Sequence, residues 1–278
     1  MVLSRSRTQT KFVVLPPSKL TAAGVFRNVE VDTGRHDQLF ADMQRFRGRV
    51  YKDDGAIQNG ELTADGRHKV SIDEESWHVL SLDMHGRVVS CLRYLDESHA
   101  AAFEDLWVKH AELARCPKLG RNFRGAVEAG MAKARKQGMG FGEVGGWAVA
   151  EDHRWTLEPL RIILATYGLL QLLGGCSGVA TATFRHSSAM ILRRIGLSSL
   201  VAGGQELPPY YDSQYRCQME ILQFDSRNPN PKYADWVAEL AGLLTAAPVV
   251  CRESFAQSLQ GVFRGFDVSD PNLVAAAI

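Results

Sequence analysis

The sequence predicts an α/β protein in which helices flank one central mixed β-sheet within a single domain. Two observations lead to this fold class. Residues 76–95 contain two apolar, β-prone runs around a short loop at Met84–Gly86, which is typical of an antiparallel hairpin. Residues 140–184 read as a strand, a helix and a second strand, the order that places two strands in parallel. Both kinds of pairing in one chain imply a mixed sheet.

The first half of the chain begins with residues 1–36, which we expect to form a loosely structured arm. From Asp37 onward a helix is predicted, because one face of it would carry the apolar residues Leu39, Phe40, Met43, Phe46 and Val50. Residues 52–70 are polar and glycine-rich, and they predict a long loop able to order over a ligand. After the hairpin, two helical stretches are expected at about 99–114 and 122–137.

The second half alternates helices and strands. Gly174 and Gly175 are expected to stop the helix between the two parallel strands. In order, we expect a helix at 157–173, a strand at 178–184, a short helix at 187–197, a strand at 215–224 and a helix at 232–246. The predicted organisation is an N-terminal arm (1–36), an α/β domain (37–227) and a C-terminal helical extension (228–278).

Composition excludes several classes of protein. The chain has 278 residues, 45% hydrophobic and 23% charged, and its net charge of +1 gives no general attraction to nucleic acid or anionic membranes. The apolar run at 12–15 is too short for a signal peptide or a membrane span. Five widely spaced cysteines show no zinc-ligand spacing and fit a reduced compartment. We therefore expect a cytoplasmic protein without a metal site, an integral membrane segment or a nucleic-acid partner.

The stretch GFGEVGGWAVAEDHR, residues 140–154, places a carboxylate and neighbouring glycines inside a strand. Val144, Trp147 and Val149 belong in a core, yet Glu143 stands among them. Glycines within a strand commonly mark a bulge or a close approach of the backbone to a ligand. Taken alone, the stretch also fits a solvated glutamate at a strand end, with glycines that only accommodate packing.

This stretch resembles the central strand of the acyl-homoserine lactone (autoinducer) synthases and the related N-acyl amino acid synthases, which have the GNAT acyltransferase fold. In that family a catalytic glutamate precedes an apolar residue, Ser, Arg, an aromatic residue, Ala and Val; here Glu143 precedes Val-Gly-Gly-Trp-Ala-Val. The segment RGRVY is similar to the family's Arg-x-x-Val-Phe, which places Arg47 on its functional arginine and Tyr51 on the aromatic residue. The hairpin places Arg93 on the arginine that ends the second strand.

The helix SSAMILRRIGL is similar to a late helix of the family, so the resemblance covers roughly residues 38–224. It implies that the 37–227 domain is GNAT-like. Gly145 and Gly146 depart from the family's Ser and Arg, and the acidic pair before the hairpin is only loosely kept, as Asp73 and Glu74. These departures count against homoserine lactone as the product.

The resemblance implies transfer of an acyl group from a thioester to an amine. An α-amine of pKa near ~8 is mostly protonated at pH 7, so a desolvated carboxylate is useful as the base. Glu143 is the candidate base, and a bulge at Gly145 and Gly146 would free an amide N–H for the thioester oxygen. The further candidates for substrate binding are Arg47, Arg93, Asp73, Trp77, Trp147, Thr181 and Thr183. Structural roles are the alternative for each of these side chains.

The expected acyl donor is acyl carrier protein. Acetyl-CoA enzymes of this fold carry a glycine-bearing loop that cradles the pyrophosphate, but EDHRWTLEPLR follows the strand here. The tyrosine that such enzymes use to protonate the thiolate would fall near Leu192. Basic residues for an acidic carrier are expected in two helices: Arg121, Arg124, Lys133, Arg135, Lys136, Arg193 and Arg194. A solvated helix face is the alternative explanation for this basic patch.

The predicted function is N-acylation of an amino acid or related small amine, with Arg47 and Arg93 pairing the carboxylate of the acceptor. No tightly bound cofactor is expected; acyl-phosphopantetheine or acyl-CoA is the co-substrate. Two alternatives stay open, an acetyl-CoA-dependent N-acetyltransferase of the same fold and a non-catalytic GNAT-fold sensor or scaffold that binds acyl chains.

Overall fold

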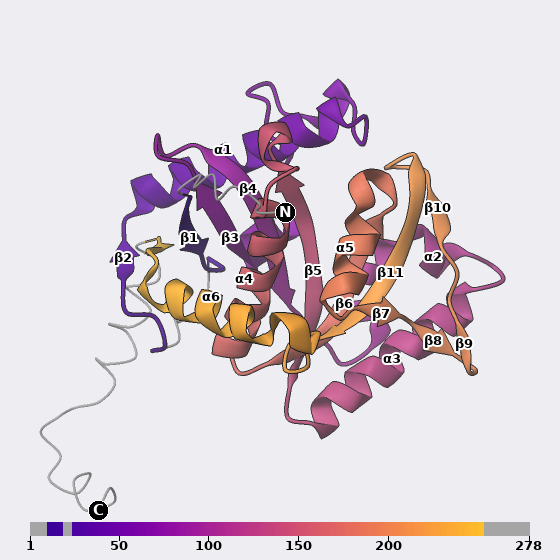
Figure 1. The fold of residues 1–278 in the computed structure, drawn as a ribbon. Helices are drawn as coiled ribbons and strands as arrows, with labels where there is room; N and C mark the ends of the chain where they lie inside the picture. Colours follow the sequence, from indigo (N-terminus) through magenta and orange to yellow (C-terminus); the bar gives the residue numbers. More distant parts are fainter. Residues whose placement is uncertain (1–9, 19–23, 253–278) are drawn as a thin grey trace, which may run out of the picture.

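The computed structural model describes residues 10–18 and 24–252, and its centre is a ten-stranded mixed β-sheet (Figure 1). The strands are β1 (Lys11–Leu15), β2 (Val29–Val31), β3 (Ser76–Leu82), β4 (Val88–Asp96), β5 (Gly140–Val149), β6 (Cys176–Thr183), β7 (Ser198–Ser199), β10 (Tyr210–Asp212), β11 (Cys217–Asp225) and β12 (Val249–Cys251). Their order is β10-β11-β6-β5-β4-β3-β1-β12-β2, with β7 paired to β11. A separate small sheet pairs β8 (Val201–Ala202) with β9 (Gln205–Glu206).

Helices cover both faces of the sheet. They are α1 (Thr33–Asp53), α2 (Glu112–Arg115), α3 (Gly120–Lys136), α4 (Glu158–Leu172), α5 (Ser188–Ile195) and α6 (Ala234–Ala246). Helix α4 packs on β3 and β4 and is covered by α6, and both lie in front of the strands in Figure 1. On the opposite face α1 contacts β4 and β5, and α3 contacts β5 and β6.

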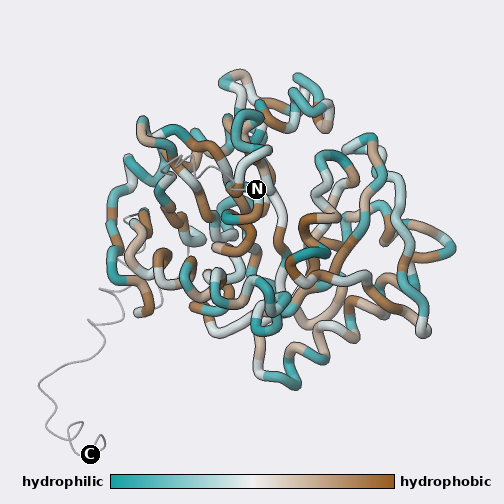
Figure 2. The backbone as a smooth tube through the Cα atoms, in the orientation of Figure 1, coloured by the Kyte–Doolittle hydropathy of each residue, from teal (hydrophilic) through white to brown (hydrophobic). Residues whose placement is uncertain are grey.

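The apolar pattern of the sequence explains these layers. The five apolar residues predicted to line one face of α1 are all buried, and Asp32 caps that helix by accepting a hydrogen bond from the amide of Arg35 at 2.9 Å. Helix α4 is buried over most of its length, and Figure 2 shows it and the central strands as largely hydrophobic. It ends before Gly174 and Gly175, whose positive φ angles of 101° and 90° favour glycine.

The prediction of one helix at 99–114 is wrong. Residues 103–105 and 107–110 form short 3₁₀ turns, and only α2 is α-helical. Of the buried apolar residues in 99–114, Phe103, Leu106 and Leu113 would share one helical face, but Val108 would lie on another. The Asp105 carboxylate accepts the amides of residues 101 and 102, which satisfies donors that a helix would otherwise use.

The expectation of a loosely structured N-terminal arm is also wrong for residues 11–15. They form β1, which pairs antiparallel with β3 and parallel with β12. Both β1 and β12 lie outside the 37–227 range, yet both belong to the central sheet. Within the described part of the chain, no helix is long and apolar enough to cross a membrane.

Candidate active site

A cavity of about 700 Å³ opens where β5 and β6 separate. The two strands pair in parallel from Gly140 and Cys176 as far as Val144 and Ala180. Beyond that point β5 continues along β4 to Val149, while β6 continues along β11. The parts of β5 and β6 that no longer pair with each other line the cavity, including Thr181 and Thr183. The site is therefore a slot in the sheet itself.

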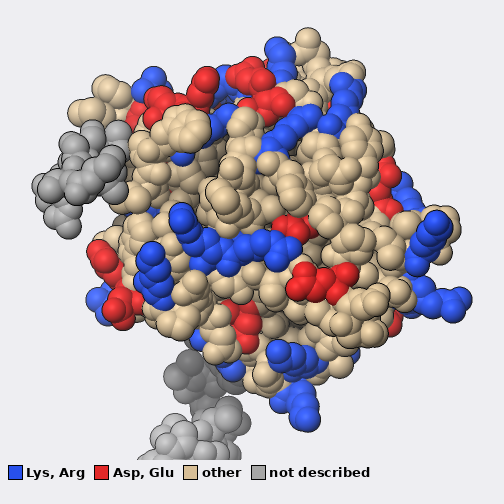
Figure 3. Space-filling view, turned by 45° about the vertical axis from the view of Figure 1, so that its right-hand side comes forward, with Lys and Arg blue, Asp and Glu red and all other residues tan. Residues whose placement is uncertain are grey.

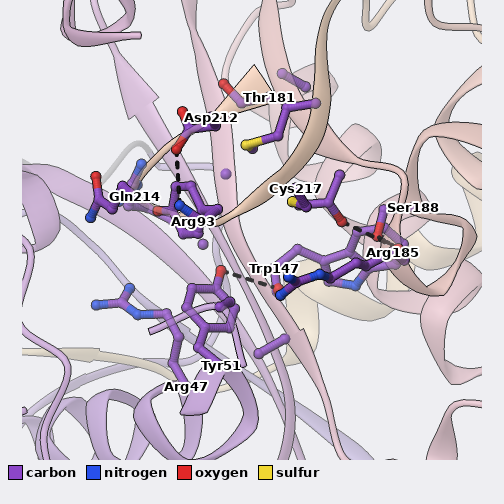
Figure 4. A pocket seen from close by; sticks show the side chains of 18 of the residues that line it. Arg47, Tyr51, Arg93, Trp147, Thr181, Arg185, Ser188, Asp212, Gln214 and Cys217 are labelled. Carbon is purple, nitrogen blue, oxygen red and sulfur yellow. Dashed lines mark hydrogen bonds between the residues drawn. The ribbon is translucent and has the colours of Figure 1, made fainter. Parts of the chain in front are cut away.

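The walls of this cavity differ in polarity. Helices α4 and α5 contribute the apolar residues Pro159, Ile191 and Leu192. Helix α1, the segment after it and the β10 region contribute polar residues, chiefly Arg47, Tyr51, His68, Tyr210, Asp212 and Tyr215. Figure 4 shows Tyr51 reaching toward Trp147, whose carbonyl accepts a hydrogen bond from the Tyr51 hydroxyl at 3.3 Å.

β5 bulges next to the glycine pair, as the sequence predicted, with Gly146 and Trp147 opposite Leu92 of β4. Arg93 of β4 pairs with Gly145 and Cys91 pairs with Ala148, so β5 contains one residue more than β4 in this interval. Gly146 has a φ of 63°, in the left-handed region that favours glycine. A Cβ on Gly145 would lie 3.2 Å from Nη2 of Arg93. Larger residues at these positions would strain the backbone or press on the arginine.

Glu143 lies beside this bulge and lines the cavity. Its side chain is buried, and its Oε1 accepts a hydrogen bond from Nη2 of Arg93 at 3.3 Å. The Oε2 atom has no hydrogen-bond partner among the described residues. Burial raises the pKa of Glu143, while the nearby Arg93 charge opposes that shift. The predicted position of Glu143 inside a strand is confirmed, and the structure places that strand beside the cavity.

A buried ion pair between Arg47 and Asp73 lies next to the site. Both Nη atoms of Arg47 donate to the carboxylate of Asp73, at 2.9 and 2.6 Å, and Nη2 also donates to the carbonyl of His68. Burial opposes ionisation of Asp73, but Arg47 outweighs it and holds the pKa of that carboxyl well below its usual range. Asp73 also lies 3.8 Å from Nη1 of Arg93. Arg47, Asp73, Arg93 and Glu143 thus form one continuous charged row.

Two histidines beside this row are uncharged at neutral pH. Burial lowers the pKa of His68 and of His78 to about 4. His78 contacts the carbonyl of Asp73 through Nε2 at 2.8 Å, whereas Nδ1 of His68 has no partner among the described residues. In the described ranges no group of histidine, cysteine, aspartate or glutamate side chains is arranged to hold a metal ion.

The structure brings most of the predicted site residues together but not all. Arg47, Arg93, Trp147, Thr181 and Thr183 line the cavity with Glu143 and its glycines. Asp73 does not line the cavity itself, but it contacts the lining residues Arg47, Arg93 and Val70. Trp77 lies elsewhere: its side chain is buried in the core next to Phe26, with ring centroids 5.8 Å apart. The prediction that Trp77 contacts the substrate is therefore wrong, because its ring packs in the hydrophobic core.

The cations predicted to bind a carrier protein are partly engaged within the chain. Arg124 pairs with Glu104 and Glu128, and Arg193 pairs with Glu220. Arg135 donates to backbone carbonyls of residues 100 and 101. Among the described residues no hydrogen bond or salt bridge engages the side chains of Arg121, Lys133, Lys136 and Arg194. Figure 3 shows basic and acidic side chains interspersed on the displayed face.

Sequence reasoning missed one whole wall of the cavity. β10 and the turn after it contribute Tyr210, Asp212 and Tyr215. β10 has only three residues, too few to show a recognisable alternation. Arg115 of α2 and Lys69 also line the cavity, and no local motif singled them out.

The sheet, its separated parallel strands and the flanking helices define the fold of the GNAT-like acyltransferases, which confirms the fold class predicted from the sequence. Among solved structures, that of BjaI, a CoA-dependent acyl-homoserine lactone synthase with SAM and isopentyl-CoA, has a TM-score of 0.53 at 13% identity, covering 90% of this chain and 99% of that one. BjaI with MTA gives the same values. FeeM, an N-acyl amino acid synthase from uncultured soil microbes, has a TM-score of 0.45 at 9% identity, covering 79% and 93%.

At this level of identity the likeness establishes the fold. No protein-family model matches the chain, and no curated protein matches it in sequence.

Proposed function

We propose that the protein is an N-acyltransferase that moves an acyl chain from an acyl-carrier-protein thioester to the amine of an amino acid or related small molecule. One observation carries the proposal: a buried carboxylate, Glu143, faces the cavity with its Oε2 unpartnered among the described residues. An unpaired buried acceptor is costly, and a substrate N–H would satisfy it. The separated strands provide the slot in which a thioester would lie.

The reaction follows from these groups. The amine nitrogen attacks the thioester carbonyl carbon, and Glu143 accepts the proton that the amine loses, directly or through water. Because burial raises the pKa of Glu143, the carboxylate is a stronger base than an exposed one. An amide freed by the bulge at Gly146 would bind the oxyanion, an interaction worth roughly 3 kcal/mol in the transition state.

The geometry supports different roles for the two arginines. Arg47 is occupied by Asp73 and by the carbonyl of His68, so we assign it to holding the site rather than the substrate. Arg93 keeps its Nε without a partner among the described residues and lies next to Glu143. Arg115 and Lys69 line the cavity, and neither forms a salt bridge within the described part of the chain. An acceptor carboxylate would pair with Arg93 or with these two cations.

The donor assignment rests on the connection between β5 and α4. Residues 150–157 contain no glycine to bring backbone amides close to a pyrophosphate. The exposed cations of α3 and α5 that remain unpaired in the described structure are suited to an acidic carrier. An experiment on the function must therefore compare acyl carrier protein with CoA as the carrier of the acyl group.

The experiment supplies long-chain acyl carrier protein, the matching acyl-CoA or acetyl-CoA, each with a panel of amino acids and S-adenosylmethionine. Thiol release is followed continuously, and products are identified by mass. An N-acyl amino acid formed from the carrier protein is the expected product. Lactone formation from S-adenosylmethionine alone would overturn the acceptor, acetyl transfer alone would overturn the donor, and acyl binding without turnover would overturn the enzyme assignment.

A further inference from the structure

Asp212 is a buried carboxylate in the active-site cavity that has no cation beside it. The residue is 7% exposed, and it lines the same cavity as Glu143. No salt bridge joins it to another side chain in the part of the chain that the structure describes. Because an unpaired charge that is removed from water destabilises the fold, such a carboxylate indicates that a ligand supplies the missing cation.

The Asp212 carboxylate is held in one orientation by the turn that follows β10. Its Oδ1 accepts a hydrogen bond from the amide of Tyr215 at 2.9 Å (Figure 4). The next residue, Ser213, donates its amide at 3.2 Å and its hydroxyl to the carboxylate of Glu112 on α2. Oδ2 of Asp212 accepts no hydrogen bond from the described residues. This oxygen is therefore fixed in place and free to accept a donor from a ligand.

Tyr210 supplies a second unpartnered oxygen on the same side of β10. Its Oη is buried, and no described residue bonds to it. Tyr210 and Asp212 are two positions apart in the strand, so their side chains project from the same face. A hydroxyl can accept a hydrogen bond as well as donate one. Burial raises the pKa of Tyr210 well above its usual range, and the carboxylates of Asp212 and Glu143 raise it further, so the hydroxyl lies near both.

The cations of the cavity lie on other elements. Arg115 is on α2, three positions after Glu112, a spacing at which the two side chains can pair. Lys69 lies on the segment between α1 and β3, and Arg93 lies on β4. An acceptor therefore meets cations at Lys69 and Arg93 and an anion at Asp212. A molecule with a carboxylate, a reactive amine and a second cationic group complements these charges.

We propose that Asp212 and Tyr210 bind the cationic side chain of the acceptor, which makes the acceptor a basic amino acid such as lysine, ornithine or arginine. The inference rests on the acyl transfer proposed above and names its acceptor. An ammonium or guanidinium group provides both the charge that Asp212 lacks and N–H donors for the two unpartnered oxygens. A sulfonium ion would provide the charge alone.

The same arrangement selects which nitrogen is acylated. An α-amine has a pKa of about 8, whereas the amine of a lysine side chain has a pKa of about 10.4. Because Asp212 favours the charged form of the side chain still more, the neutral nucleophile is the α-amine beside Glu143. The α-nitrogen bonds to the acyl carbon as the carbon–sulfur bond breaks, and the electron pair stays on sulfur. The proton that the nitrogen gives to Glu143 passes through solvent to the thiolate, so the products are an Nα-acyl amino acid and a free thiol.

The test measures kcat/KM for two matched pairs of acceptors with the acyl donor that the wild type uses. Lysine is compared with norleucine, which lacks the side-chain amine, and arginine with citrulline, which has a neutral urea in place of the guanidinium. We expect the wild type to prefer the basic member of each pair by about 10²-fold. Asp212→Asn, which keeps an oxygen for the Tyr215 amide, should reduce this preference to about twofold. Mass fragmentation of the lysine product should place the acyl group on the α-nitrogen.

Asp152→Asn is the matched control, because the Asp152 side chain is 78% exposed and lies outside the cavity; this variant should keep the preference. Equal kcat/KM within each pair for the wild type, a preference for S-adenosylmethionine, acylation of the side-chain nitrogen, or a preference that survives in Asp212→Asn would overturn this inference while leaving the acyltransferase intact. No N-acyl product from the wild type with any acceptor would overturn the proposed function as well. Removing a buried charge that lacks a partner should not lower Tm, so a large fall in Tm for Asp212→Asn would show that the carboxylate is structural.

Discussion

Replacing Asp73 with asparagine tests the charged row beneath the active site. The Asp73 carboxylate accepts two hydrogen bonds from Arg47, one from the side chain of Gln44 at 3.0 Å and one from the amide of Val70 at 3.1 Å. Asparagine keeps the size of the side chain but removes its charge. Arg47, whose side chain is 1% exposed, would then be a buried cation without a counter-ion.

The expected loss of stability follows from this geometry. Breaking a buried pair by removing one partner costs about 3–5 kcal/mol, because the remaining charge stays desolvated. In a chain of this size such a loss lowers Tm by roughly 10 °C. Arg93, which lies 3.8 Å from Asp73, loses part of its neutralisation too.

The stability difference between the wild type and Asp73→Asn should depend on pH in a defined direction. The pKa of Asp73 is lower in the folded protein than in the unfolded chain, so the pair stabilises the fold at pH values above the unfolded pKa of about 4. As the pH falls below that value, the advantage of the wild type over Asp73→Asn should shrink. Urea unfolding at pH 7 and at lower pH measures it as a shift in midpoint at constant m.

The control is Asp65→Asn, which removes an exposed carboxylate paired with Arg45 and Arg67. Exposed pairs contribute little, so its midpoint should stay close to that of the wild type. A loss below about 1 kcal/mol for Asp73→Asn at pH 7 would refute the reasoning, since it would show that Arg47 is hydrated or neutralised elsewhere. A difference that does not change with pH would do the same.

Two further predictions concern catalysis and the donor. Glu143→Gln should lower kcat by about 10²- to 10⁴-fold and abolish the acidic limb of the pH profile of kcat. In the wild type this limb should lie above the usual carboxyl range, because burial raises the pKa of Glu143. Unchanged turnover would eliminate Glu143 as the base. Reversing Arg121 and Lys133 to glutamate should weaken carrier-protein binding several-fold, and wild-type affinity should fall with salt. Carrier-protein affinity that does not change with salt, measured by titration calorimetry, would argue against electrostatic recognition of the carrier protein.

Local sequence signals predicted the helices and central strands well. The apolar period of α1 and the glycines after α4 each depend on residues within a few positions of one another. The same holds for the bulge, because Gly145 and Gly146 are adjacent in the chain. At 99–114, where Val108 leaves the helical face that Phe103, Leu106 and Leu113 would share, the prediction of a helix was wrong.

Tertiary structure alone decided which side chains meet. The hydrogen bonds of Arg47 to Asp73 and of Arg93 to Glu143 join residues 26 and 50 positions apart. No pattern within a short segment of the sequence predicts that Asp73 pairs with Arg47, the arginine that was expected to bind the substrate. Tyr210 enters the site only because β10 lies along β11, which lies along β6.

The sequence by itself determined the α/β class, the position of Glu143 on a core strand and the need for glycine beside it, because backbone conformation and apolar periodicity are properties of short segments. The cavity, the charged row and the orphaned hydroxyl of Tyr210 arise from the separation of β5 and β6 and from contacts across the sheet. Burial and electrostatic coupling depend on the whole fold, so the raised pKa of Glu143 and the lowered pKa of Asp73 became visible only in three dimensions.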